Sequence, residues 1–148
     1  MEINRFDSEY RFLSNFYEAP VVFEGMTYPS NEAAFQAAKC LDMKEREPFT
    51  AMPPSEAKRR GRRVALRPDW EEVKVSIMKA IVLDKFTRNP ELKAKLLATG
   101  DARLAEGNSW RDRFWGVDAA TGHGKNHLGL ILMEVREELR QKGGTEQL

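Results

Sequence analysis

The sequence predicts an α+β fold that is rich in helix and carries a small β-hairpin near its N-terminus. Up to about residue 30, β-branched and aromatic residues stand between turn residues, whereas apolar residues recur every three or four positions afterwards. The chain has 148 residues, 41% of them apolar, which suits one ordinary hydrophobic core. Because no internal repeat and no linker composition interrupts this pattern, we expect a single domain over residues 1–148 with a core of about 6–140.

The β-hairpin is expected between Pro20 and Tyr28. Valine, phenylalanine and tyrosine flank the pair Glu24-Gly25, and Gly25 can adopt the positive φ that a tight hairpin turn needs. Residues 11–17 precede the hairpin and are expected to form a strand or an extended loop.

The first helix is expected from Asn31 to Leu41, with Ser30 as its N-cap and Glu32 near the positive end of the helix dipole. A charged connection that contains prolines, residues 42–54, should follow. Ser55 is then expected to cap a short basic helix over residues 56–63.

The longest predicted helix begins with a pattern like a capping box at residues 69–72 and runs to about Arg88. Its expected buried stripe consists of Val73, Ile77, Met78, Ile81 and Val82.

The last third of the chain should contain two more helices and one strand. One helix restarts at Asn89-Pro90 and ends at Gly100, residues 103–106 form a strand, and an amphipathic helix begins near Asn126. Residues 142–148 are expected to be a frayed tail.

Composition and charge exclude several classes of protein. The formal net charge is +1, so no global field attracts the whole surface to nucleic acid or lipid. A single cysteine, Cys40, cannot form an internal disulfide or a thiolate zinc site. The sequence has neither a run of about 18 apolar residues nor a basic and apolar leader, so we expect a soluble cytoplasmic protein without a membrane partner.

The segment from Asn108 to Gly116 is the most informative part of the sequence. It holds two tryptophans, two arginines and Asp112 without a helical or strand period. Such a loop suits a concave site in which a flat ring covers a flat ligand and a carboxylate handles a proton. The alternative is a buried loop whose tryptophans fill the core.

The first helix has a polar face. At about 100° per residue, Glu32, Gln36 and Lys39 fall on one side and small alanines on the other. This face could line a cleft, although an acidic residue at a helix start is more often a surface group that stabilises the dipole.

Two further segments have the composition of anion sites. Five cations in residues 58–63 could bind phosphate, although a solvated helix surface is the more frequent explanation. The glycine-rich turn at 121–126 could hold a phosphate with Lys125, but it lacks the spacing of a P-loop. His123 and His127 are four residues apart without the acidic partner of a metalloprotease, so we expect no metal.

The inventory of acid, aromatic, amide and cation, without a metal or cofactor pattern, matches cleavage of an N-glycosidic bond. In that reaction the anomeric carbon of the ribose gains positive charge in the transition state. A carboxylate can stabilise this charge, or it can activate the water that attacks the carbon.

Five blocks of sequence occur in an order that resembles the NADAR family, also called YbiA-like. The resemblance covers about residues 6–140 and rests on Phe12–Tyr17, Tyr28–Lys39, Ala98–Asp101, Glu106–Gly116 and Asn126–Met133. It implies a compact α+β fold and N-glycosidase activity, since members hydrolyse ribosylated intermediates of riboflavin synthesis or remove ADP-ribose from modified nucleobases.

The same resemblance assigns roles by motif. Glu32 becomes the leading catalytic carboxylate, and Asp112 is expected to assist it. Trp115 becomes a site residue, which we expect to stack on the heterocycle. Independently of the resemblance, the cations Lys39, Arg111 and Lys125 are candidates for phosphate binding. The remaining expected substrate-binding residues are Asn15, Phe16, Gln36, Gly116 and Asn126.

The expected partner is a small nucleotide-like substrate, of the ADP-ribose or ribosylaminopyrimidine phosphate type, and ADP-ribosylated nucleic acid is a further candidate. We expect no cofactor. Two alternatives stay open: a module that binds ADP-ribose or NAD without turning it over, and a nucleic-acid-binding protein that uses residues 58–63.

Overall fold

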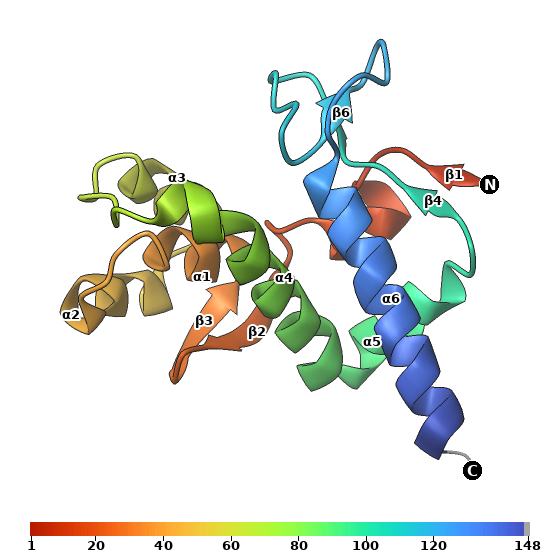
Figure 1. Cartoon of the computed structure of the whole chain (residues 1–148), viewed down its shortest axis with the longest axis horizontal. Helices are drawn as coiled ribbons and strands as arrows, with labels where there is room; N and C mark the ends of the chain where they lie inside the picture. Colours follow the sequence, from red (N-terminus) through yellow and green to blue (C-terminus); the bar gives the residue numbers. More distant parts are fainter. Residues whose placement is uncertain (147–148) are drawn as a thin grey trace. The chain divides into compact units, whose positions relative to one another are not determined.

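The computed structural model of the chain describes residues 1–146 (Figure 1). Their contacts divide the chain into two compact units. Unit 2 is continuous and contains Asn15–Asn89, whereas unit 1 combines Met1–Ser14 with the chain from Pro90 onward. Helices predominate over short strands in both units, which confirms the predicted α+β class.

Unit 2 begins with the predicted hairpin. Strand β2 (Glu18–Phe23) pairs antiparallel with β3 (Met26–Ser30). The turn uses positive φ at Glu24 (45°) and Gly25 (86°), the combination that matches the twist of a two-residue hairpin. The hairpin prediction is confirmed.

Helix α1 (Asn31–Ala37) follows β3 without a break. The Ser30 Oγ accepts the backbone N–H of Ala33 at 3.1 Å, so the predicted N-cap is confirmed. The helix is shorter than predicted, because the N–H groups of Lys39 and Cys40 bond to carbonyls three residues back and tighten the last turn. All residues of α1 are buried.

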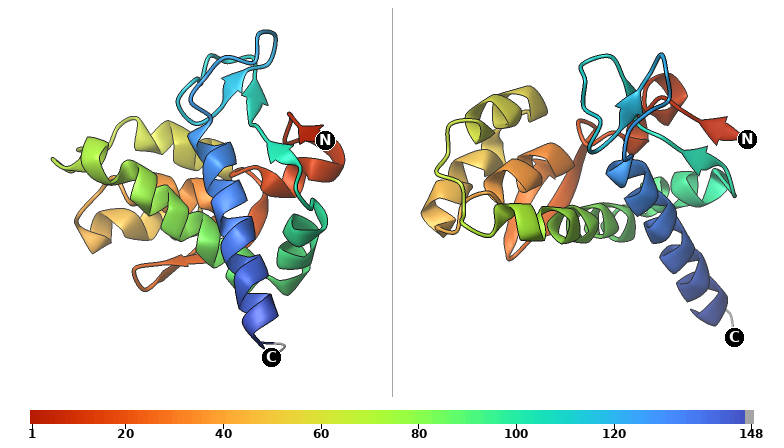
Figure 2. Two further views of the ribbon diagram at one scale, coloured as in Figure 1. Left: turned by 45° about the vertical axis from the view of Figure 1, so that its right-hand side comes forward. Right: turned by 45° about the horizontal axis from the view of Figure 1, so that its top comes forward.

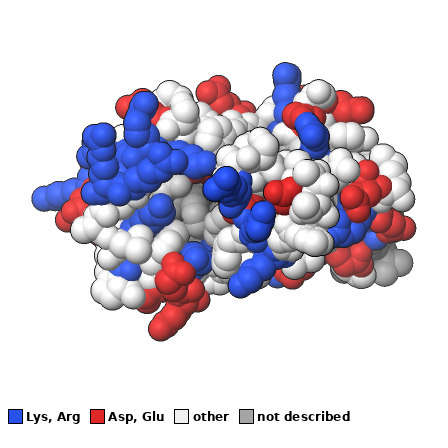
Figure 3. Space-filling view, turned by 90° about the horizontal axis from the view of Figure 1, so that it is seen from above, with Lys and Arg blue, Asp and Glu red and all other residues white. Residues whose placement is uncertain are grey.

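The connection after α1 contains two short helices that the sequence did not predict: α2 (Met43–Arg46) and the 3₁₀ helix η2 (Glu47–Ala51). Helix α3 (Pro54–Gly61) begins at a proline, so the predicted Ser55 cap is wrong. Proline suits the first helical position because it has no N–H to satisfy. The basic side chains of α3 form a broad patch on one face of the molecule (Figure 3).

Helix α4 (Trp70–Arg88) packs against β2 and α1 (Figure 2). Its predicted stripe is confirmed for four of the five residues, since Val73 is only half-buried. Asp69 occupies the N-cap position but makes no capping bond. Its carboxylate instead accepts two hydrogen bonds from Arg67, at 2.7 and 3.1 Å.

Unit 1 joins the two ends of the chain. Strand β1 (Glu2–Ile3) pairs in parallel with β4 (Arg103–Leu104), which confirms the start of the predicted strand. The 3₁₀ helix η1 (Ser8–Leu13) replaces the strand or loop that was predicted from residue 11. The prediction is wrong for residues 11–13, because a helical turn buries Phe12 and Leu13 together, a spacing that alternation does not reveal. Residues 14–17 lie in a loop.

Helix α5 (Pro90–Ala98) ends just before Gly100, which has a φ of 63°, and packs against α6 (His127–Glu146). Helix α6 confirms the predicted amphipathic helix, since it buries apolar residues at three- and four-residue spacing: Leu128, Ile131, Leu132, Val135 and Leu139. It continues to Glu146, so the predicted frayed tail is wrong up to that residue. Residues 147 and 148 lie outside the described part of the chain.

Strands β5 (Gly107–Asn108) and β6 (Val117–Asp118) form a short parallel pair at the two ends of the loop that contains Trp110 and Trp115. None of the helices within residues 1–146 has the length and apolar character needed to cross a membrane.

Candidate active site

Glu32 lies in the first turn of α1 and is only 7% exposed. Its backbone N–H donates to the carbonyl of Asn15 at 3.0 Å, which anchors the start of the helix. Its carboxylate accepts a hydrogen bond of 2.8 Å from the Gln36 amide, one turn further along. The first-helix carboxylate is therefore a buried group and not the surface residue of the alternative interpretation.

Asn15 links three parts of unit 2 around this carboxylate. Its side-chain oxygen accepts from the amide of Asn31 at 3.1 Å, and its side-chain amide points to the sulfur of Met78 at 3.5 Å. The predicted substrate-binding residue Asn15 therefore holds the N-terminus of α1 against α4.

Gly61 provides the space in which Gln36 lies. A Cβ atom at this position would stand 1.8 Å from the Gln36 side-chain oxygen and 2.6 Å from its Cδ. Residue 61 must therefore lack a side chain if the Gln36 amide is to reach Glu32. The sequence alone does not reveal this requirement, because it depends on the contact between α1 and α3.

Two buried acceptor oxygens beside Glu32, those of the Asn31 and Gln36 side chains, have no hydrogen-bond partner in the described part of the chain. Buried polar atoms are nearly always paired in folded proteins, and exceptions gather at functional sites. Folding alone does not explain this concentration of polar groups.

Lys39 completes the cluster. It is half-buried, and its ammonium donates to the carbonyl of Gly61 at 3.5 Å. Burial lowers the pKa of Lys39 below its ordinary value, and the nearby Glu32 carboxylate partly offsets this effect. We call Asn15, Glu32, Gln36, Lys39 and Gly61 the Glu32 cluster.

Phe16 is 42% exposed, and the ammonium of Lys58 lies 5.7 Å from the centre of its ring. An exposed ring beside a cation can stack on a flat heterocycle, as the predicted substrate-binding role requires.

The loop between Asn108 and Gly116 belongs to unit 1 and is built around buried side-chain amides. The Asn108 amide donates to the carbonyl of Asp112 and to the carboxylate of Glu106, both at 2.9 Å, and its oxygen accepts the N–H of Asp112. Asp112 in turn accepts the N–H groups of Phe114 and Trp115 at 3.2 and 3.0 Å. The geometry thus gives Asp112 the task of shaping the turn that carries Trp115.

Glu106 is a half-buried carboxylate that sequence reasoning did not single out. Besides accepting from Asn108, it lies against Gly116, where a Cβ atom would stand 1.9 Å from its Oε2. At the predicted site residue Gly116, the close packing of Glu106 therefore leaves no room for a side chain. The position of Glu106 in the sequence, directly before the turn-forming pair Gly107-Asn108, could have indicated that this carboxylate faces the loop.

The two tryptophans of the loop differ in environment. Trp110 is 62% exposed, so the alternative in which both tryptophans fill the core is wrong for this residue. Trp115 is half-buried and packs edge-to-face with Phe114, with ring centres 4.8 Å apart. The ring centres of Phe114 and His127 are 4.5 Å apart, and His127 belongs to α6. Phe114 therefore packs between the Trp115 ring and α6.

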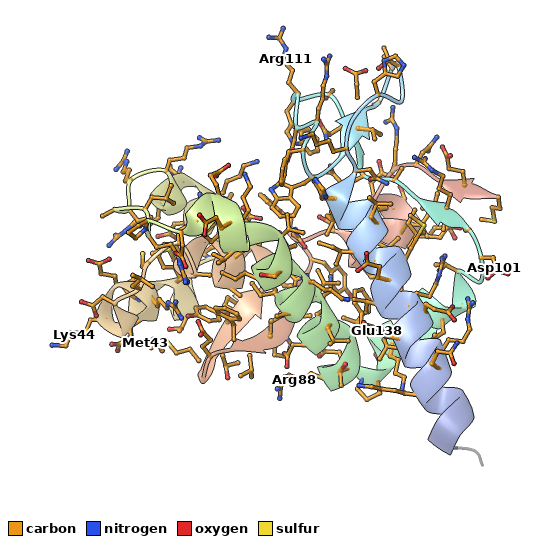
Figure 4. The ribbon with its side chains drawn as sticks, viewed as in Figure 1. Met43, Lys44, Arg88, Asp101, Arg111 and Glu138 are labelled. Carbon is orange, nitrogen blue, oxygen red and sulfur yellow. The ribbon has the colours of Figure 1, made fainter. Side chains whose placement is uncertain are left out.

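The predicted phosphate ligands of this unit lie on its surface. Arg111 has a φ of 67°, and its exposed side chain points away from the loop (Figure 4). Lys125 is also exposed, with its ammonium 5.7 Å from the Phe114 ring centre.

Asn126 has a structural task in the fold. It is 2% exposed with a φ of 53°. Its side-chain amide donates to the carbonyl of Leu104 at 3.0 Å, and its oxygen accepts the N–H of Glu106 at 3.1 Å. Both ends of this predicted substrate-binding side chain are thus committed to the backbone.

Within residues 1–146, no three His, Cys, Asp or Glu side chains come together in an arrangement that could hold a metal ion. The groups described above are a buried carboxylate, a lysine with a lowered pKa and aromatic rings.

Comparison with known proteins adds family membership. The family model of the NADAR domain matches residues 3–140. N-glycosidase YbiA of Escherichia coli is 43% identical over 134 residues, which cover 88% of this chain and 82% of that protein. The riboflavin biosynthesis protein VVA0006 of Vibrio vulnificus is 42% identical over 138 residues, but the chain covers only 37% of its length.

Similarity extends to the fold. The NMR structure of the E. coli protein YbiA matches with a TM-score of 0.83 and 40% identity, and the match covers 97% of this chain and 86% of that one. Sequence, family model and structure agree: the chain belongs to the NADAR family, and it is a hydrolase of the N-glycosidase type.

Proposed function

We propose that the chain hydrolyses the N-glycosidic bond of a ribose-phosphate or ADP-ribose conjugate without a metal ion or a cofactor, and that Glu32 is the principal catalytic group. The observation that carries this proposal is the burial of Glu32 with a neutral amide as hydrogen-bond donor. Burying a carboxylate in this way costs stability, and such groups are concentrated where chemistry needs them.

The reaction suits this carboxylate. As the heterocycle leaves, positive charge develops on the anomeric carbon of the ribose, and a fixed negative charge nearby lowers the energy of that state. The same carboxylate can accept a proton from the attacking water. The hydrogen bond from the Gln36 amide orients the Glu32 carboxylate.

The remaining predicted residues supply recognition. Within unit 2, Phe16 offers a ring for the heterocycle and Lys39 a cation for phosphate. For Trp115, Arg111 and Lys125 of unit 1, stacking and phosphate binding stay predictions. For Asp112, Gly116 and Asn126 we propose a supporting part, because their described contacts are made to the loop itself.

The names of two relatives support the proposed substrate class. One relative is named a riboflavin biosynthesis protein and others N-glycosidases, which supports a ribosylated pyrimidine phosphate as a substrate. An ADP-ribosylated guanine nucleoside has the same bond type with a larger phosphate group. It forms the second candidate.

A Glu32→Gln variant tests the proposal. Incubated with each of the two substrates, the wild-type protein should release the free heterocycle or amine, measured by chromatography, and the variant should be slower by about 10²- to 10⁴-fold. Glu72→Gln is the matched control, because Glu72 also lies in the first turn of a helix but is exposed.

Full activity of Glu32→Gln would remove this carboxylate from the mechanism. Tight binding of ADP-ribose by calorimetry, with no product from either substrate over hours, would favour the alternative of a binding module.

A further inference from the structure

We propose that α3 and the turn after it form a docking surface for single-stranded nucleic acid. The surface consists of Lys58, Arg59, Arg60, Arg62 and Arg63, and we call it the α3 basic surface. It is a binding site in its own right, and the proposal does not depend on which small molecule the Glu32 cluster hydrolyses.

The charge of this surface is not neutralised locally. Residues 57–66 contain five cations and no carboxylate, and Glu56, the one carboxylate of α3, forms no ion pair with them among the described residues. Arg59, Arg60, Arg62 and Arg63 are all exposed, and no ion pair is found for any of the four among the described residues. Figure 3 shows the resulting patch as a continuous group of Lys and Arg side chains.

Arginines on other helices of the chain behave differently. Arg88 of α4 pairs with Asp84 at 3.0 Å, and Arg140 of α6 pairs with Glu137 at 3.0 Å. Such pairs at three- or four-residue spacing are the usual arrangement on a solvated helix, whereas like charges at this spacing destabilise a helix. The α3 basic surface therefore lacks the feature that a purely solvated helix would have.

The fold directs these cations outward together. Pro54, Ala57 and Gly61 form the buried face of α3, and Gly61 lies against Gln36 of α1. Because α3 is anchored through small residues on one side, its long side chains Arg59 and Arg60 remain exposed. Arginine guanidinium groups match phosphate oxygens in a forked geometry.

An aromatic ring lies at the edge of the surface. Phe16 is 42% exposed, and the Lys58 ammonium lies 5.7 Å from its ring centre. Cations that follow a phosphate backbone, combined with a ring on which a base can stack, are the recurring features of single-strand binding sites. In a duplex the bases are already stacked on each other, so the ring would add little.

The α3 basic surface adjoins the Glu32 cluster within unit 2. Arg62 and Lys58 both contribute to lowering the pKa of Lys39, because their charges are near its ammonium. A strand docked on α3 would therefore bring one of its nucleotides next to Glu32.

Fluorescence anisotropy with a labelled 12-nucleotide oligothymidylate tests the proposal. The variant is Arg59→Gln/Arg60→Gln/Arg63→Gln, and the control is Lys44→Gln/Lys95→Gln/Lys142→Gln, three exposed lysines elsewhere. Each variant removes three cations, so both change the formal net charge from +1 to −2. We expect the arginine variant to bind at least about tenfold more weakly, and the slope of log K against log salt to become shallower by about 2.

The control variant should keep the wild-type slope. Phe16→Leu should weaken binding by about tenfold without changing the slope, because it removes stacking and no charge. Equal losses in the two triple variants would overturn the proposal, since they would show an effect of net charge alone. Tighter binding of a duplex of the same length would overturn the single-strand assignment.

Hydrolysis of a mononucleotide-sized substrate separates this inference from the proposed function. Among the described residues, no side-chain hydrogen bond or ion pair joins Arg59, Arg60 or Arg63 to the Glu32 cluster, so the arginine variant should hydrolyse such a substrate at the wild-type rate. Loss of oligonucleotide binding with unchanged hydrolysis supports the docking surface, whatever result Glu32→Gln gives.

Discussion

Glu32 and Asp112 were predicted as a catalytic pair, but the contacts that hold them differ in kind. The Glu32 carboxylate accepts a hydrogen bond from a side-chain amide, while the Asp112 carboxylate accepts hydrogen bonds from two backbone N–H groups of its own loop. A sequence cannot distinguish these cases, since aspartate and asparagine are favoured both in turns and in binding sites. The same ambiguity explains why Asn126 was predicted to bind substrate, although its amide joins two backbone segments.

Replacement of Asp112 separates the two roles. Asparagine keeps an acceptor oxygen for the N–H groups of Phe114 and Trp115, whereas alanine removes it. We therefore expect Asp112→Asn to retain turnover within a few-fold, and Asp112→Ala to lower the free energy of unfolding by about 1–2 kcal/mol. Urea unfolding and single-turnover rates measure the two effects.

A catalytic Asp112 would give the opposite pattern. Asp112→Asn would then fold normally and lose turnover by about a hundredfold or more, because the negative charge itself would be missing. The comparison is informative because asparagine and aspartate have nearly the same shape.

At the scale of elements, the local signals in the sequence were reliable where one residue decides the geometry. Gly25 marked the hairpin turn and Ser30 the start of α1, and both are confirmed. The short α2 and η2 were missed because four or five residues are too few to establish a helical period. The close contact between α1 and α3 could not be predicted, since it joins residues that no local pattern relates.

Gly61 makes this contact testable. In Gly61→Ala the new methyl group would displace the Gln36 side chain, because only the flexible amide can give way. Alanine is the better helix former by about 0.8–1 kcal/mol, so the variant should remain folded. We expect turnover to fall by about 10- to 100-fold, since the charged Glu32 carboxylate loses the hydrogen bond that the neutral Gln36 amide donates to it.

Gly143→Ala is the control for this substitution. Gly143 also lies in a helix, and a Cβ atom there would meet nothing within 4 Å. This variant should keep wild-type turnover. Unchanged turnover in Gly61→Ala would show that Gln36 does not position the Glu32 carboxylate. Thermal unfolding of both variants checks that each is folded at the assay temperature.

At the scale of the whole molecule, composition and periodicity predicted the α+β class, but not how the chain is divided. Unit 1 assembles from both ends because β1 pairs with β4 across about a hundred residues. A pairing of two residues per strand leaves no signal in the sequence. The predicted stripe of α4 likewise stopped at Val82, although Lys85 continues it and is 0% exposed. Lysine is so rarely buried that sequence reasoning places it on the surface.

Lys85 should therefore control how stability depends on pH. Burial lowers its pKa from the ordinary 10.5 to about 7 in the folded protein, where its ammonium lies 5.4 Å from the Tyr17 ring centre. Between pH 7 and 10 the unfolded chain keeps this proton and the folded protein releases it. Because the unfolded state binds more protons in this window, the free energy of unfolding contributed by Lys85 rises with pH, by up to about 1.4 kcal/mol per pH unit, and becomes constant below about pH 7.

Lys85→Met should remove this dependence. Urea unfolding of the wild-type protein and the variant at pH 7, 8 and 9 gives the difference between their unfolding free energies, and we expect the wild-type protein to gain relative to the variant at each step. Burial raises the pKa of both Tyr28 and Cys40, which lowers stability at high pH, but these groups are common to both proteins and cancel in the difference. Lys44→Met, at an exposed lysine of α2, should follow the wild-type curve. Parallel curves for Lys85→Met and the wild-type protein would show that Lys85 keeps its proton in the folded state, and that unit 2 stabilises a buried ammonium through polar contacts.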